Sequence, residues 1–459
     1  MAQDVDGAAK AAESTVDPKT LRRAIGASAI GNMTEWFDYG VYAYTATYIG
    51  AAFFPSDDPT ASTLGSLLVF AVSFLIRPVG GIVWGPLGDR IGRQRVLATT
   101  ILLMAGATFC VGLLPGYGTL GILAPIGLIL LRMIQGFSTG GEYGGAATFM
   151  AEYAPDRKRG KYGSFLEFGT LAGFTLGAGL VLVISQIVGE EAMADWGWRL
   201  PFLVAAPLGL IGLYLRSKLE DTPVFRECAA EGKIDEKAKK HFKDLLGYWK
   251  PLLLLMGLVV TLNIVNYTLL AYMPTYLETE IGLSATSSLV LIIIGQLAMM
   301  ALLPFSGAWS DKVGRKPLWW ISIVGLFVMA IPMFQLMSSG FVGAVIAFAV
   351  LGLLYVPQLS TISAMFPAMF PTHVRYAGFA IAYNISTSLF GGTAPAINQG
   401  LINSSGDTLF PAYYMMAACV VGAVALIFVP ETRACSIRGR GIPGVDTKPQ
   451  MEPVPAPVR

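Results

Sequence analysis

Two loops of one pattern decide the architecture of this chain: Gly85-Pro-Leu-Gly-Asp-Arg-Ile-Gly-Arg-Gln94 recurs as Gly307-Ala-Trp-Ser-Asp-Lys-Val-Gly-Arg-Lys316. Each loop follows an apolar segment that is long enough to cross a bilayer. A second pair of loops, Pro155-Asp-Arg-Lys-Arg159 and Pro371-Thr-His-Val-Arg375, repeats in the same order. Two repeated loops in register indicate an internal duplication, so we expect two equivalent halves.

The composition excludes an ordinary soluble enzyme. Of the 459 residues, 54% are hydrophobic and only 14% are charged, whereas soluble domains have about 25% charged residues. So few charged side chains cannot cover the surfaces of the two or three soluble domains that this length would form. We therefore expect an all-α, polytopic membrane protein with a surface that faces lipid.

Apolar windows of about 20 residues predict twelve transmembrane helices in two six-helix halves. The predicted helices begin near Leu21, Leu64, Val96, Leu120, Tyr162, Trp198, Pro251, Ser284, Leu318, Gly340, Tyr376 and Leu409. The expected parts are a cytoplasmic N-terminal tail (1–20), a first bundle (21–216), a central cytoplasmic loop (217–250), a second bundle (251–432) and a disordered cytoplasmic tail (433–459). The last tail is rich in Pro and Gly, which disfavours a coiled coil.

The distribution of basic residues predicts the orientation. All lysines and arginines except Arg77, Arg132 and Arg199 fall in segments that share one side of the membrane. The positive-inside rule then puts both termini in the cytoplasm, in a multi-pass protein of the plasma (cytoplasmic) membrane. The polar N-terminal segment does not have the features of a signal peptide.

Other classes of function find no support in the sequence. The four cysteines and two histidines are widely spaced, so we expect neither a metal site nor a disulfide framework. No phosphate-binding loop of an ATP-driven pump is present, and the net charge of +2 does not favour nucleic-acid binding. We expect a monomer without cofactor or catalytic residues.

Six charged residues lie within predicted helices, all in the first half: Glu35, Asp38, Arg77, Arg132, Glu142 and Glu167. A charge in the bilayer costs at least about 2.5–3.5 kcal/mol, so such residues mark a polar pathway or pair with one another. Glu167 follows the basic loop closely enough for its side chain to reach the membrane surface.

The other acidic groups are candidates for proton coupling. Glu35 and Asp38 are three residues apart, hence on one helical face. A buried carboxyl group beside an arginine can bind a proton in one access state and release it in another. We expect Asp38, Glu35 and Glu142 to share the proton, with Arg132 as counter-charge. A static salt bridge of Glu35 or Glu142 with an arginine is the alternative.

The loop 85–94 resembles the signature loop of the major facilitator superfamily, with Gln94 as its one departure. The stretches 31–38 (GNMTEWFD), 74–81 (FLIRPVGG) and 132–143 (RMIQGFSTGGEY) resemble the metabolite:proton symporter family. Within that family, AEYAPDRKRG, DWGWRLPF, AYMPTYL and PAMFPTHVRY are most similar to the proline/glycine betaine symporters. The resemblance implies proton-coupled uptake of an osmolyte by alternating access. It also implies a latch that holds one access state, formed by Asp89, Arg90, Arg93, Asp311 and Arg315.

A betaine-like zwitterion needs aromatic faces for its ammonium group and an arginine or amide for its carboxylate. The candidate substrate-binding residues are Trp36, Tyr39, Tyr42, Arg77, Arg132, Asn263, Tyr267, Tyr272 and Asn384. Symport of an organic acid, such as 2-oxoglutarate, citrate or shikimate, is an alternative because Arg77 and Arg132 could hold carboxylates. Drug:proton antiport is disfavoured, because Phe174 stands where the antiporter pattern has proline. A receptor or channel is the rival from another class.

Overall fold

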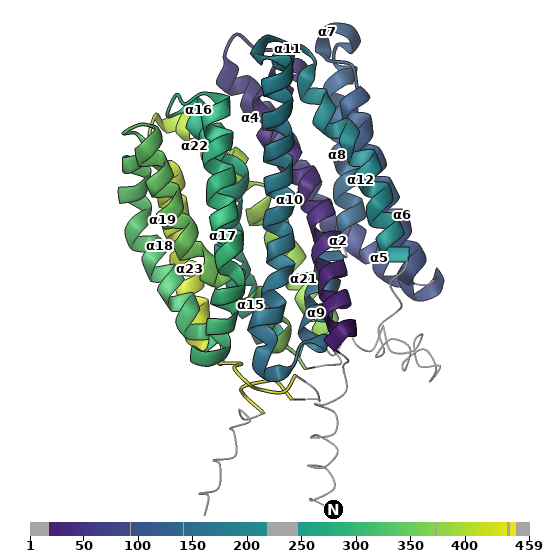
Figure 1. Cartoon of the computed structure of the whole chain (residues 1–459), viewed down its shortest axis with the longest axis vertical. Coiled ribbons are helices and arrows are strands. Elements are labelled where there is room, and N and C mark those ends of the chain that lie inside the picture. The colour runs from purple at the N-terminus through teal and green to yellow at the C-terminus, as the bar shows by residue number, and fades with distance from the viewer. Residues whose placement is uncertain are drawn as a thin grey trace, which may run out of the picture.

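The computed structural model describes residues 18–91, 93–140, 142–217, 247–371, 374–437 and 441–446, which are mostly helical. The long helices run roughly side by side, with the first part of the chain on one side of the molecule and the second part on the other (Figure 1). The described helices of the first half are α2 (Pro18–Tyr44), α3 (Ala46–Phe53), α4 (Pro59–Leu75), α5 (Arg77–Ile91), α6 (Arg93–Leu113), α7 (Tyr117–Leu120), α8 (Leu123–Thr139), α9 (Glu142–Tyr153), η1 (Asp156–Lys158), α10 (Arg159–Val188), α11 (Glu190–Asp195), η2 (Gly197–Arg199) and α12 (Leu200–Ser217).

The described helices of the second half are α15 (Trp249–Asn266), η3 (Tyr267–Tyr272), α16 (Met273–Thr279), α17 (Ala285–Val313), α18 (Arg315–Met337), α19 (Phe341–Leu359), α20 (Ile362–Met365), η4 (Pro367–Met369), α21 (Arg375–Ser386), η5 (Thr387–Gly391), α22 (Ala394–Ser405) and α23 (Phe410–Phe428). Helices α10 and α17 pack against each other where the halves meet.

The helices have the length and the surface of membrane spans. Within the described residues, eight helical runs are long and apolar enough to cross a bilayer, and Ala98–Leu113 and Gly197–Ile211 form shorter apolar helices. Large apolar side chains such as Ile82, Phe305 and Val342 are more than two-thirds exposed. Exposed apolar surface on this scale suits lipid and not water. The prediction of an all-helical membrane protein is therefore confirmed.

Several helical runs are interrupted or change their winding close to Phe74 and Arg77. Helix α4 ends at Leu75 and α5 starts at Arg77, so Arg77 stands at the break. In the second half, η3 and η5 are wide helical turns with the π geometry, which often marks functional sites. Asn263 donates to the Thr387 hydroxyl at 2.9 Å and so joins the helices that carry these two turns.

Glycines bring α4 and α5 against α8. A Cβ atom on Gly136 would overlap the carbonyl oxygen of Ser73, and one on Gly140 would overlap that of Arg77. Only glycine permits backbones to approach so closely. Because Arg132 lies one turn before Gly136, this contact carries Arg77 and Arg132 toward the same space between the helices.

The composition predicts that the C-terminal segment 433–459 is disordered. The structure nevertheless places residues 433–437 and 441–446 of this segment. Ile437 is buried in a small apolar cluster with Ala151 of the first half and Ala368 of the second. Arg375 Nη2 donates to the carbonyl oxygen of Ile437. The described tail residues therefore contact both halves.

Candidate functional site

Glu35 and Arg77 form an ion pair in the interior, with 3.6 Å between Glu35 Oε1 and Arg77 Nη2. Both side chains are almost completely buried. The guanidinium of Arg77 lies 4.7 Å from the ring centroid of Tyr39 and 4.4 Å from that of Phe74. Arg77 is therefore held by a carboxylate and by cation–π contacts, which compensate part of the cost of its burial.

Asp38 and Arg132 are joined by a chain of hydrogen bonds. The Thr108 hydroxyl donates to Asp38 Oδ2 at 2.9 Å, and Gln135 Nε2 donates to the same hydroxyl at 2.5 Å. Arg132 in turn donates to Gln135 Oε1 at 2.7 Å and to the Ser73 hydroxyl at 3.1 Å. A change of charge on Asp38 therefore acts on Arg132 through two neutral side chains.

Aromatic rings fill the space around the two arginines. Arg132 lies 4.1 Å from the ring centroid of Tyr42. The ring centroids of Phe74 and Tyr267 are 5.1 Å apart, and those of Trp36 and Tyr267 are 6.1 Å apart. Since Tyr267 belongs to η3, this cluster joins the first half to the second. We call Trp36, Tyr39, Tyr42, Phe70, Phe74, Arg77, Arg132 and Tyr267 the central cluster.

The other second-half candidates lie around this cluster in different ways. Asn384 donates to the carbonyl oxygen of Gly140 at 2.9 Å, which links α21 to the end of α8 across the two halves. Tyr272 bonds within the second half, where its hydroxyl donates to Gln399 Oε1 at 2.9 Å. Asn263, as described above, joins α15 to η5. The contacts of Tyr272 and Asn263 therefore hold the second half together.

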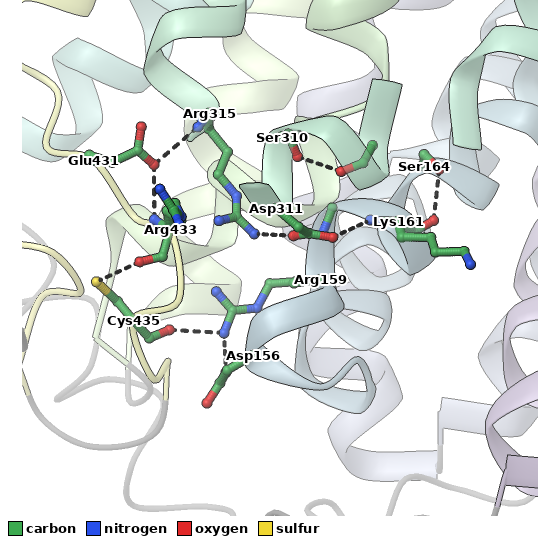
Figure 2. A network of polar contacts seen from close by, with 12 residues as sticks. Asp156, Arg159, Lys161, Ser164, Ser310, Asp311, Arg315, Glu431, Arg433 and Cys435 are labelled. Carbon is green, nitrogen blue, oxygen red and sulfur yellow. Dashed lines mark hydrogen bonds and ion pairs between the residues drawn. The ribbon is translucent and has the colours of Figure 1, made fainter. Parts of the chain in front are cut away.

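A polar network closes one end of the interface between the halves (Figure 2). The carboxylate of Asp311 accepts hydrogen bonds from the backbone N–H groups of Gly160 and Lys161, at 2.8 and 2.9 Å. Arg315 Nη2 pairs with the same carboxylate at 2.8 Å. Asp311 thus lies at the N-terminus of α10, where free N–H groups and the helix dipole favour an anion. We call this contact the latch.

The tail adds to the latch. The Glu431 carboxylate accepts from the backbone N–H groups of Arg315 and Lys316, at 3.1 and 2.9 Å, and so caps the start of α18. Arg159 Nη2 donates to the carbonyl oxygen of Cys435 at 3.1 Å, as Figure 2 shows. Both repeated arginine positions, Arg159 and Arg375, therefore hold backbone carbonyl groups of the tail.

The opposite end of the interface is also in contact. Tyr44 donates to the carbonyl oxygen of Leu270 at 2.9 Å, and Gln296 Nε2 donates to the Tyr44 hydroxyl at 2.7 Å. Nearer the surface, Gln186 donates to the Thr286 hydroxyl at 3.1 Å. The two halves therefore touch at both ends, with the central cluster enclosed between them.

Four of the candidate side chains lie outside the part of the structure that is described, namely those of Glu142, Asp89, Arg90 and Arg93. Thr108, Gln135, Phe70 and Phe74 also belong to the site, although they are not among the residues expected from the sequence. Gln135 carried a usable signal, since it is an amide in an apolar helix three residues after Arg132. Glu167 does not reach the surface: it is 3% exposed.

Comparison with known proteins agrees with this architecture. Residues 29–395 match the Major Facilitator Superfamily. The chain is 45% identical to a proline/betaine transporter of Escherichia coli over 92% of its own length and 86% of that protein. It is 45% identical, over the same shares, to a glycine betaine/proline/ectoine/pipecolic acid transporter of Dickeya dadantii. It is also 41% identical to an ectoine/proline transporter of Corynebacterium glutamicum, over 95% of its length and 89% of the relative.

The fold has solved counterparts. The proton:xylose symporter XylE superposes with a TM-score of 0.71, covering 94% of this chain and 99% of XylE at 20% sequence identity. At that identity the likeness concerns the fold alone. The paired halves, the repeated loops and these matches lead to one conclusion: the chain belongs to the major facilitator superfamily and is a multi-pass membrane transporter.

Proposed function

We propose that the protein takes up a small zwitterionic osmolyte, proline or glycine betaine, together with protons and by alternating access. The names of its relatives support this class of substrate. Both termini then lie in the cytoplasm, as the basic residues predict, and the latch is the cytoplasmic gate. We expect the monomer to be the transporting unit.

One observation carries the choice of substrate: the central cluster holds buried donors that have no hydrogen-bond partner among the described residues. Arg77 Nε and Nη2 and the Tyr267 hydroxyl make no hydrogen bond to any described residue. Such groups are costly to bury unless a ligand satisfies them at some stage. A substrate carboxylate would pair with Arg77 and accept from Tyr267.

The same cluster suits the positive end of a zwitterion. The rings of Tyr39 and Phe74 lie against Arg77, and Trp36 packs on Tyr39. Glu35 already balances one positive charge there. An ammonium group that enters beside the guanidinium would lie against these aromatic faces and the Glu35 carboxylate. We therefore assign substrate binding to Arg77 with Trp36, Tyr39 and Tyr267, and give Asn263, Tyr272 and Asn384 a supporting part in the second half.

Proton coupling is assigned to Asp38, with Arg132 as its counter-charge. The chain through Thr108 and Gln135 supports this division, because it joins Asp38 to Arg132 and not to Arg77. When Asp38 is protonated, Arg132 loses the negative charge that partly balances its own. Arg132 is then freer to move toward Arg77, where the substrate binds. Glu35 is the second acidic group of this pathway.

Uptake of labelled glycine betaine into proteoliposomes with an imposed inward proton gradient tests the proposal. We expect accumulation above equilibrium, and its loss when a protonophore is added. Accumulation that the protonophore leaves unchanged would overturn proton symport. Competition by proline, glycine betaine, 2-oxoglutarate and shikimate separates the zwitterion from the organic acid, and a channel would only equilibrate the label.

A further inference from the structure

Glu167 is a buried carboxyl group that the proposed proton and substrate pathways do not use. It lies on α10, 3% exposed, and none of the ion pairs between described residues includes it. Its Oε1 atom accepts a hydrogen bond from the Tyr143 hydroxyl of α9. An isolated carboxylate in such surroundings is expensive, so the neutral acid fits this state of the protein better.

Among the described residues, the polar groups that interact with Glu167 are neutral. They are Tyr143 from α9, Thr170 from α10 itself, Tyr355 from α19 and Tyr383 from α21. Asn32 of α2 donates to the Thr170 hydroxyl at 2.6 Å and to the carbonyl oxygen of Leu166 at 2.9 Å. Arg77 and Glu35 interact with Tyr383 but are paired with each other.

Tyr143 connects Glu167 to the second half of the protein. Its ring stacks on that of Tyr383 of α21, with centroids 4.5 Å apart and planes inclined by 16°. Beside this stack, Asn384 holds the carbonyl oxygen of Gly140. When α21 moves away with the second half, Tyr143 and Glu167 lose the cover that Tyr383 provides.

The position along α10 determines which solution would reach Glu167. It lies seven residues after Gly160 of the latch and seven before Phe174, which packs on Trp36 in the centre. Seven residues of helix span about 10 Å in each direction. Parting of the halves at the latch therefore opens a path to Glu167 from the latch side, whereas the central cluster covers it from the other.

We propose that Glu167 is a second proton-binding site, which is protonated while the latch is closed and loses its proton to the latch-side solution when the halves part there. The carboxylic acid becomes a carboxylate and the proton goes to water. The site regains a proton from that same solution before closure. It adds nothing to the stoichiometry of coupling, and it makes opening on the latch side depend on the pH of that side. This inference rests on the proposed transport cycle and on the latch as its cytoplasmic gate.

The test is exchange of labelled for unlabelled glycine betaine in proteoliposomes, measured against the pH on the latch side. We expect the exchange rate of the wild type to fall as that side is made acidic, and Glu167→Gln to lose this dependence. The accumulation ratio under a proton gradient should be the same in both proteins. A pH dependence retained by Glu167→Gln overturns the proposal, and so does loss of gradient-driven accumulation in that variant.

Tyr143→Phe is the second variant, because it keeps the stacked ring and the carboxyl group but removes the donor to Glu167. Loss of this donor destabilises the carboxylate of Glu167 relative to the neutral acid. The midpoint of the pH dependence should therefore move to higher pH, and an unmoved midpoint contradicts the assignment. Failure of the wild type to transport glycine betaine or proline would overturn the proposed function. That result is distinct from the outcomes for Glu167→Gln and Tyr143→Phe, which test the second proton site.

Discussion

At the scale of single residues, the two buried arginines differ in what satisfies them. Arg132 donates to Gln135 and Ser73, whereas Arg77 keeps two nitrogens without a hydrogen-bond partner in the described part of the protein. We expect Arg77→Lys to lose bidentate pairing with a substrate carboxylate, at a cost of about 1.5–3 kcal/mol. The apparent KM for glycine betaine should then rise about 10- to 150-fold, measured as uptake against substrate concentration.

The control for this prediction is Arg132→Lys, which changes the other buried arginine. It should alter the dependence of uptake on external pH and leave the apparent KM nearly unchanged. Equal effects of the two substitutions on KM would show that the arginines do not divide their roles as proposed.

Asp38 provides the second prediction at this scale. Asp38→Asn cannot release a proton but still accepts the hydrogen bond from Thr108. Accumulation driven by a proton gradient, about tenfold for each pH unit if one proton is carried, should fall to equilibrium while exchange continues. Steady-state accumulation and exchange, measured on the same proteoliposomes, check this. Thr108→Val is the comparison, since it leaves the carboxyl group in place but breaks its link to Gln135. Full gradient-driven accumulation by Asp38→Asn would exclude Asp38 as the coupling site.

At the scale of helices, α10 and α17 cross at a contact between two glycines. A Cβ atom on Gly307 would lie 2.5 Å from the carbonyl oxygen of Gly160, which no relaxed structure tolerates. Gly307→Ala should therefore push α10 and α17 apart beside the latch, at a cost of about 1–3 kcal/mol to the closed arrangement. We expect a maleimide to label Cys435, whose carbonyl oxygen contacts Arg159 beside the latch, faster in this variant.

A glycine on the same molecule without such a neighbour serves as the matched control. Gly106 of α6 has open space where its Cβ atom would lie, so Gly106→Ala should leave the latch unchanged. If both substitutions behave alike, the crossing of α10 and α17 is not what limits separation of the halves.

At the scale of the whole molecule, the C-terminal tail connects the two halves below the latch. Burial raises the pKa of the Cys435 thiol, so the thiol stays protonated and reacts slowly while the tail is docked. Ile437→Asp puts a charge between Ala151 and Ala368 and should release the tail. The rate of maleimide labelling of Cys435, in a protein whose other cysteines are replaced by serine, should then rise at least about tenfold.

The control is Val445→Asp, because Val445 belongs to the same tail but is exposed. It should not change the labelling rate of Cys435, measured against the same protein with Ile437 intact. A slow rate in Ile437→Asp would mean that the polar contacts of Arg159 and Arg375 hold the tail without the apolar cluster.

The sequence by itself determined the membrane class, the helical fold, the repeated loops and four of the charged residues in the interior, Glu35, Asp38, Arg77 and Arg132. The reason is that bilayer thickness, backbone hydrogen bonding and the cost of charge in hydrocarbon act locally along the chain. Only the tertiary structure decided which charges meet: Glu35 pairs with Arg77, and Asp38 reaches Arg132 through Thr108 and Gln135. It also decided that Glu167 is buried, because cover by Tyr143 and Tyr383 comes from helices far apart in the chain. Contacts across such separations depend on how helices pack, which no local pattern encodes.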